Sequence, residues 1–319
     1  MTPRWLTLGA LQLAAMLCGA ETGTTAVLIE PAVAHLGSSD WVALARPQLL
    51  RAACVPGAQP TLLLSIDPPS RREIAACEAA GQTVALTQPI GWEAVYLVAR
   101  EAGWAGLGSR ELYLALAAVV PRVGGGFVAN AARRWREIGP GLPDAPIRVL
   151  MPPPEQPPSA LFARTVLEPG CLQSPAARAI FDPAERVSRC TFLRVDGIVE
   201  TAAPDGDPWS WLDAQPPYAI AVVTLRDIAN LDDRFVVVPV EGVMPTYSAV
   251  VHGGYPASWQ VILTVTGAKG VPDLVSAAVD LASESMIGPG GRMAAKGLTP
   301  LAAVERVALR VRVLRAKDR

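Results

Sequence analysis

Residues 135–171 read WREIGPGLPDAPIRVLMPPPEQPPSALFARTVLEPGC, and this stretch decides the predicted fold. Three prolines exclude a helix before residue 147, so residues 147–150 are a predicted short strand. A proline-rich connection follows, and Ser159 is placed to cap a helix with apolar positions at Leu161 and Phe162. Free amides and the helix dipole meet at such a helix start, so a strand, a loop and a helix in this order are typical of an anion site.

The composition and the order of predicted elements indicate an α/β protein. The chain has 319 residues, 51% of them hydrophobic, which is enough for two lobes with sizeable cores. Predicted strands and helices alternate without an internal repeat, which favours α/β architecture. The net charge is −1, so the sequence lacks the basic excess of a nucleic-acid-binding protein.

The first 20 residues predict an export signal. Arg4 is followed by an apolar run of 12 residues from Leu6 to Leu17, which is too short for a relaxed membrane span. Small residues precede the predicted cleavage after Ala20. Two alternatives stay open: an ordinary buried first element, and a lipoprotein acylated on Cys18, which the bulky Leu17 disfavours.

The remaining cysteines predict two disulfides in an oxidising compartment. Cys54, Cys77, Cys171 and Cys190 allow three pairings, of which joining neighbours along the chain is the simplest. Each such bridge closes a loop of about twenty residues and is worth roughly 3 kcal/mol. With no C-x-x-C motif and only two histidines, the sequence predicts no metal site.

Catalytic and cofactor motifs are absent from the sequence. It has no Walker phosphate loop, no G-x-S-x-G elbow and no H-E-x-x-H pair, and the three consecutive glycines at 124–126 are not followed by a lysine. We therefore expect neither an enzyme nor a bound cofactor.

Four segments carry a resemblance to the periplasmic phosphate-binding proteins of phosphate ABC transporters. Residues 135–171 are similar to that family's W-x-D/E-I-x-P-x-L-P-x-x-P-I-x-V-x-x-P-P-x-S-G-T pattern, which ends in E-P-G-C. Residues 70–81 resemble its S-R-x-I-x-x-x-E-x-x-x-C-x-x-x-G. Residues 236–265 resemble its V-P-V-D-G-V-x-P-T segment and the following return strand, and residues 288–301 resemble its C-terminal G-L-x-P-L region.

This resemblance implies a type II periplasmic-binding-protein fold, with two lobes of mixed sheet flanked by helices and two hinge crossings near residues 89–96 and 255–265. Lobe 1 would comprise residues 21–92 plus 258–319, and lobe 2 residues 93–257. The resemblance also implies a periplasmic monomer that holds a small anion or another small solute between its lobes, with a transporter permease as partner.

Site residues follow from the same resemblance. Ser70 and Arg71 occupy matching family positions. Ser38 and Ser39, in the GSSD sequence at 37–40, are interpreted as the remnant of a ligand loop, although plain helix capping explains them as well. Gln156 completes the set together with Ser159, already placed at a helix start.

The family's ligand motif is altered in this chain. Its S-G-T falls on Gln156, Pro157 and Pro158, which removes two hydroxyl groups and two backbone N–H donors. We therefore predict that phosphate does not bind tightly. The alternative function is a ligand-free or signalling derivative that acts as a protein-interaction module.

Three other elements are predicted from patterning. Residues 41–54 read as a helix opened by the GSSD sequence, and residues 83–100 as two strand-like runs around Pro89. Residues 299–315 read as the last helix, with Thr299 as N-cap and Pro300 in its first turn. The apolar stripe of this predicted helix comprises Leu301, Val304, Val307, Ala308 and Val311.

Overall fold

The structure is a computed structural model that describes residues 26–55, 61–104, 107–122, 124–203, 206–229, 231–267 and 272–316. The predicted export signal at 1–20, with Cys18, lies outside these residues. The chain forms two compact units, each described by itself below. Unit 1 takes its residues from Met1–Ile90, Val261–Gly288 and Ala303–Arg319, and unit 2 from Gly91–Gln260 and Pro289–Ala302.

The polypeptide passes between the units at four places. Two of them lie within β4 (Thr83–Ala99) and β11 (Ser258–Gly267), in the ranges predicted for the crossings. The other two flank residues 289–302, which the sequence analysis did not predict. This segment belongs to unit 2 because β12 (Thr299–Pro300) pairs with β4, with Thr299 opposite Trp92.

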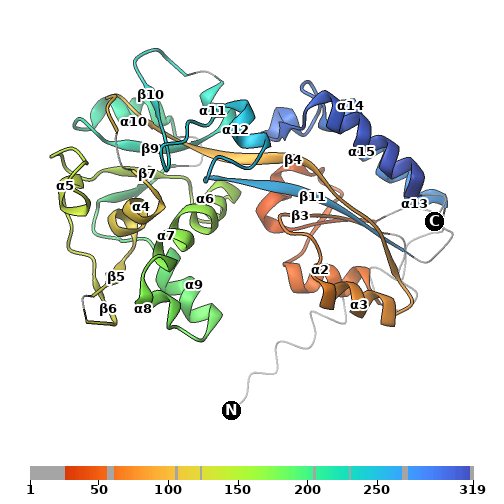
Figure 1. The fold of residues 1–319 in the computed structure, drawn as a ribbon. Helices are drawn as coiled ribbons and strands as arrows, with labels where there is room; N and C mark the ends of the chain where they lie inside the picture. The colour runs from red at the N-terminus through yellow and green to blue at the C-terminus, as the bar shows by residue number, and fades with distance from the viewer. Residues whose placement is uncertain are drawn as a thin grey trace. The chain divides into compact units, whose positions relative to one another are not determined.

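Unit 1 is a mixed sheet with helices (Figure 1). Its strands run in the order β2-β1-β3-β11-β4, in which β2, β1 and β3 are parallel and β11 is antiparallel to β3. Its remaining elements are β1 (Ala26–Ile29), the 3-10 helix η1 (Pro31–Leu36), β2 (Val42–Ala43), α2 (Arg46–Ala53), β3 (Thr61–Ser65), α3 (Arg71–Ala79), α13 (Pro272–Leu281), α14 (Glu284–Ile287) and α15 (Ala303–Arg315).

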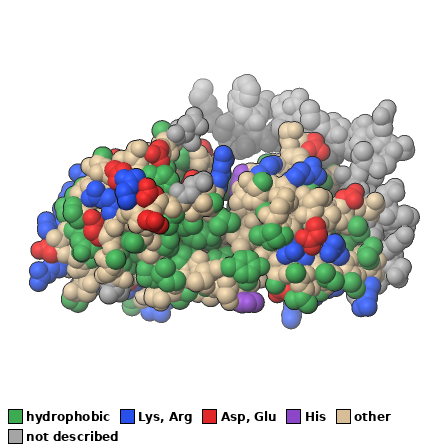
Figure 2. Space-filling model, turned by 90° about the horizontal axis from the view of Figure 1, so that it is seen from above, with side chains coloured by type: hydrophobic (Ala, Val, Ile, Leu, Met, Phe, Trp, Pro, Cys, Tyr) green, Lys and Arg blue, Asp and Glu red, His purple; other side chains and the backbone are tan. Residues whose placement is uncertain are grey.

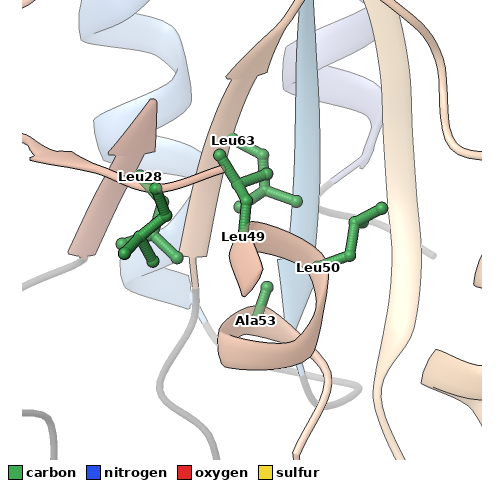
Figure 3. Packing of buried hydrophobic residues seen from close by; sticks show 6 residues of the cluster. Leu28, Leu49, Leu50, Ala53 and Leu63 are labelled. Atoms are coloured by element: carbon green, nitrogen blue, oxygen red, sulfur yellow. The ribbon is translucent and has the colours of Figure 1, made fainter. Parts of the chain in front are cut away.

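The core of unit 1 lies between α2 and the parallel strands. Leu49, Leu50 and Ala53 of α2 form a buried cluster with Leu28 of β1 and Leu63 of β3, and the close-up in Figure 3 shows Leu49 beside Leu63. The side chain of Leu49 is 1% exposed and that of Leu63 also 1%. This continuous apolar packing explains why β3 reads as an unbroken hydrophobic run rather than an alternating one.

The predicted helix over residues 41–54 is wrong in its first half. Val42 and Ala43 form β2, which pairs in parallel with Leu28 and Ile29 of β1. The helix α2 begins only at Arg46, and a proline in its first turn supplies the start signal. Pairing with the sheet satisfies the backbone of residues 42–43, so tertiary contacts override their helical patterning.

Two further predictions are corrected. Residues 83–99 form one continuous strand, β4, rather than two runs around Pro89. The last helix starts at Ala303, because Thr299 and Pro300 belong to β12 and cannot open it. Of its predicted apolar stripe, Val304, Val307 and Val311 face solvent, whereas Leu301 precedes the helix and is buried. The helix α15 buries Leu309 and Val313 instead.

Unit 2 contains a second sheet and most of the helices. Its strands run in the order β4-β9-β7-β8, with β10 and β12 also paired to β4, and β5 and β6 form a separate hairpin. Its elements are β5 (Val119–Pro121), β6 (Phe127–Ala129), β7 (Val149–Met151), β8 (Val199–Thr201), β9 (Ile220–Thr224), β10 (Val236–Val238), α4 (Ser109–Leu116), α5 (Trp135–Ile138), α6 (Pro157–Phe162), the π-helix η2 (Ala163–Leu167), α7 (Glu168–Leu172), α8 (Pro175–Arg178), α9 (Pro183–Thr191), α10 (Pro208–Ala214), α11 (Leu225–Ile228), α12 (Tyr247–Val251) and η3 (Ala294–Lys296).

Residues 135–171 build the centre of unit 2. Trp135 is fully buried, meets Trp104 edge to face at 5.3 Å, and donates its indole N–H to the carbonyl of Tyr218 at 3.0 Å. Residues 157–172 run through α6, η2 and α7 without a break. Gly170 lets α7 cross α4, because a Cβ at this position would lie 2.0 Å from the carbonyl oxygen of Ser109.

Two disulfides fasten helices within the units. Cys54 after α2 is bonded to Cys77 of α3 in unit 1, and Cys171 of α7 to Cys190 of α9 in unit 2, so each bridge joins neighbours along the chain. None of the helices in the described ranges has the length and apolarity needed to cross a membrane. On the face shown in Figure 2, basic and acidic side chains are interspersed rather than separated by sign.

Candidate functional site

In unit 1, the predicted residues Ser70 and Arg71 lie where the β3 strand leads through a short loop into α3. Ser70 is the N-cap of α3: its hydroxyl accepts from the amide of Glu73 at 3.3 Å. The Glu73 carboxylate accepts in turn from the amide of Ser70 at 2.6 Å. This reciprocal capping box satisfies two amides of the helix start, so the serine hydroxyl is engaged by the helix itself.

Arg46 of α2 fixes this loop from the other side. Its guanidinium donates to the carbonyls of Asp67 at 3.0 Å and Pro68 at 2.8 Å. It also lies 3.4 Å from the Glu73 carboxylate. Partial burial alone would raise the pKa of Glu73, but the hydrogen bonds from Ser70 and the charge of Arg46 outweigh it and lower the pKa. A carboxylate that stays ionised therefore occupies the start of α3.

A small pocket opens beside this loop within unit 1. Its lining combines apolar side chains of α2 and β3 with the polar residues Arg46, Ser65 and Thr264. The hydroxyl of Ser65 donates to the carbonyl of Asp67 at 2.8 Å. The lining comprises Arg46, Leu49, Leu50, Leu63, Ser65, Asp67, Pro69 and Thr264.

The other predicted residues of unit 1 are exposed. Arg71 is the first residue of α3, and within the described ranges the structure gives its side chain neither an ion pair nor a hydrogen bond. Ser38 and Ser39 lie in the exposed turn that follows η1 and cap no helix, because β2 intervenes before α2. The structure thus gathers Ser70 and Arg71 at one helix start and leaves the two serines in a separate turn.

In unit 2, Gln156 and Ser159 flank the start of α6, which follows β7. Gln156 is the N-cap residue but makes no side-chain capping bond. Ser159 is not the predicted cap, because the helix already begins at Pro157. Its hydroxyl donates to the carbonyl of Pro152 at 2.7 Å, and its amide donates to the carbonyl of Gln156 at 3.1 Å.

The start of α6 consequently has few donors left for a ligand. Pro157 and Pro158 have no backbone N–H, and the amide of Ser159 is already used. Proline suits the first helical turn because the amides there lack partners within the helix. An oxyanion at this helix start would therefore miss the amide hydrogen bonds that normally hold it.

A third helix start was missed by the sequence analysis. The Glu241 carboxylate accepts from the amide of Ser109 at 2.8 Å and so occupies the start of α4. Glu241 has a left-handed backbone with φ of 53°, and its amide donates to the carbonyl of Leu107 at 3.1 Å. Gly108 permits this approach, since a Cβ there would lie 2.7 Å from the carboxylate. The only sequence signal was the turn-forming Gly242 that follows Glu241.

A cluster of buried polar groups also went unpredicted in unit 2. The Glu93 carboxylate, 5% exposed, accepts from the indole of Trp259 at 3.0 Å. Tyr96 and Tyr255 stack with ring centroids 6.3 Å apart. Burial is the main cause that raises the pKa of Tyr255, and the neighbouring Tyr96 raises it further. The described residues contain no set of three His, Cys, Asp or Glu side chains that could hold a metal ion.

Comparison with known proteins identifies the fold. No protein-family model and no curated protein sequence matches the chain. Solved structures do match. A possible phosphate binding protein from Planctomyces limnophilus has a TM-score of 0.62 at 12% identity, covering 93% of this chain and 99% of that one. PstS from Borrelia burgdorferi has a TM-score of 0.57 at 13% identity, covering 88% and 100%.

A third match is an ABC-type phosphate transport receptor from Vibrio cholerae, with a TM-score of 0.52 at 10% identity, covering 86% of this chain and 99% of that one. These similarities define the class of fold: the chain has the mixed α/β, two-lobe fold of periplasmic phosphate-binding proteins. The fold predicted from the sequence is thereby confirmed, and the resemblance to the PstS-like proteins extends to three dimensions.

Proposed function

We propose that this protein is an exported, periplasmic solute-binding protein that works with an ABC transporter permease, and that its solute is not inorganic phosphate. The fold supports the first part, because it is the fold of periplasmic phosphate-binding proteins. The start of α6 supports the second part. Two prolines there leave it without the amide donors that an oxyanion needs.

The chemistry of the helix starts supports a solute with less negative charge than phosphate. Carboxylates of Glu73 and Glu241 occupy the starts of α3 and α4, and each would repel an added anion. Prolines surround the start of α6 and offer apolar surface instead. A neutral or zwitterionic metabolite fits these groups better than a divalent oxyanion does.

A panel measured by thermal unfolding tests the proposal. Phosphate, sulfate, amino acids, sugars and short peptides are added singly to the purified protein. A solute that binds stabilises the folded protein by RT ln(1+[L]/Kd), or about 2.7 kcal/mol at a hundredfold excess over Kd. We expect a stabilising solute among the neutral or zwitterionic members. A response to phosphate alone would overturn the proposed solute class.

The same occupied helix starts also favour a second candidate function, a ligand-free derivative that acts as a protein-interaction module. In that case no member of the panel would raise the melting temperature. The immobilised protein would then capture the transporter permease or a signalling protein, and added solutes would not change this capture. That result would support the interaction module.

Arg71 is the residue we propose to contact the solute in unit 1, because it is exposed and engages no described residue. Arg71→Ala should weaken binding of the stabilising solute by about 1.5–3 kcal/mol, the usual contribution of a charged hydrogen bond. Arg72→Ala is the matched control, as Arg72 is the next residue and is also exposed. Equal affinities for both variants would remove Arg71 from the site.

A further inference from the structure

The outer face of α15, the C-terminal helix of unit 1 in Figure 1, is apolar. The inner face buries Leu309 and Val313 at 0% and 1% exposure. The stripe on the outer face, named here the α15 outer stripe, consists of Val304, Val307, Val311 and Leu314, which are 74%, 51%, 39% and 53% exposed. Their spacing of three, four and three residues aligns them along one side of the helix.

Solvation alone does not account for this stripe. Single exposed apolar residues are normal on protein surfaces, but a contiguous apolar strip marks an interaction surface. Valine is also a weaker helix former than alanine or leucine because its branched side chain loses rotamer freedom in a helix. Three valines on the solvent side of one helix therefore indicate that this side contacts something apolar.

Arginines border the stripe on both sides. With 3.6 residues per turn, Arg310 lies along one edge, and Arg312 and Arg315 lie along the other. Arg310 pairs with Glu284 of α14 at 3.3 Å. Arg312 and Arg315 make no ion pair or hydrogen bond within the described part of the chain. The border thus has unpaired positive charge beside an exposed apolar strip.

We propose that α15 binds an anionic lipid surface, with the outer stripe inserted at the headgroup boundary and the bordering arginines on lipid phosphates. A narrow apolar strip between basic residues is the pattern of interfacial helices, whose arginines extend their guanidinium groups to the headgroups. A second copy of this chain would bring like charges together.

Binding of this kind is weak and reversible. One helix with four apolar side chains inserts little surface, so association depends on both the stripe and the charge attraction. Salt should weaken it, because the contacts between arginine and lipid are exposed to solvent and are screened. The proposal is independent of the solute that the protein binds.

Sedimentation with vesicles tests the proposal. The full purified chain is mixed with vesicles of phosphatidylcholine alone, or of phosphatidylcholine and phosphatidylglycerol at roughly three to one, in low salt. We expect the protein to sediment with the anionic vesicles only. Val307→Ser combined with Val311→Ser should reduce the partition coefficient at least about tenfold. Arg312→Gln combined with Arg315→Gln should reduce it and flatten its salt dependence.

Val195→Ser is the matched control, since Val195 is 91% exposed and belongs to unit 2, which does not contain α15. It should sediment like the unaltered protein, and thermal unfolding should show all variants folded. The proposal is overturned if the unaltered protein ignores anionic vesicles or if the Val307/Val311 variant still binds them fully. A concentration-dependent dimer that the same variant abolishes would also overturn it, in favour of a second copy.

Discussion

The helices α3 in unit 1 and α6 in unit 2 both follow a strand and a proline-containing loop, yet they satisfy their first backbone amides differently. At α3, the side chains of Ser70 and Glu73 exchange hydrogen bonds with the backbone. At α6, Pro157 and Pro158 remove two amides altogether. A side-chain cap can be undone by one substitution, whereas a missing N–H can be restored only by replacing the prolines. The two helix starts therefore differ in how readily they could accept a ligand.

One disulfide holds α3 in unit 1, and another holds α7, which continues from α6, in unit 2. Removing either disulfide should have the largest effect on the free energy of unfolding. Replacing Cys54 and Cys77 by serine frees α3 from α2, and replacing Cys171 and Cys190 frees α7 from α9. Each double variant should lower the free energy of unfolding by about 3 kcal/mol, because each bridge closes a loop of similar length. Urea denaturation measures this. A loss below about 1 kcal/mol for one bridge would show that packing alone holds that region.

The second-largest effect should come from Arg46, whose hydrogen bonds hold the loop before α3. In the described structure, α6 has no equivalent of these hydrogen bonds. Arg46→Ala removes hydrogen bonds to the carbonyls of Asp67 and Pro68 and the pairing with Glu73. We expect a loss of about 1.5–3 kcal/mol in urea denaturation. Arg71→Ala, which loses no contact, is the control and should stay within about 0.5 kcal/mol. Equal losses would refute this role of Arg46.

Removing the side-chain cap should have a smaller effect. Ser70→Ala loses the acceptor for the Glu73 amide, so the free energy of unfolding should fall by about 1 kcal/mol. Ser39→Ala, in an exposed turn without a side-chain hydrogen bond in the described structure, is the matched control and should be neutral. If both variants are equally stable, the capping box contributes nothing measurable.

The pH dependence of the α3 start should be the subtlest effect. The pKa of Glu73 is lower in the folded protein than its ordinary value of 4.5. Its stabilising contribution is therefore complete above pH 4.5 and is lost as the pH falls through the lower folded-state pKa. Glu73→Gln should be less stable than the unaltered protein at neutral pH, and the gap should narrow below pH 4.5. A gap that stays constant between pH 6 and the acid transition would contradict the assigned pKa direction.

The sequence predicted those features that depend on local chemistry. The short strand predicted near residues 147–150 and the pairing of neighbouring cysteines were readable because each follows from residues close together in the chain. Long-range pairing was not readable. Residues 42–43 look helical until β1 pairs with them, and Thr299 resembles an N-cap until β4 draws it into a sheet. The carboxylate of Glu241 at α4 comes from 132 residues away, so no local pattern could reveal it.

The prolines at 157 and 158 were the most informative site residues in the sequence, because their effect on hydrogen bonding needs no tertiary context. The face of α15 that packs against the protein could not be predicted from the sequence in the same way. Both its faces are apolar, and only the packed structure shows that Leu309 and Val313 are buried while Val304 and Val307 are exposed. A helix with two apolar faces has no unique inner side in its sequence.

Isothermal titration of phosphate into the purified, disulfide-bonded protein tests whether the altered helix starts no longer hold an oxyanion. We predict no binding heat and no rise in melting temperature at micromolar phosphate, since α6 lacks amide donors at Pro157 and Pro158. Saturable binding at micromolar phosphate, with the matching stabilisation of about 2.7 kcal/mol at a hundredfold excess over Kd, would contradict it.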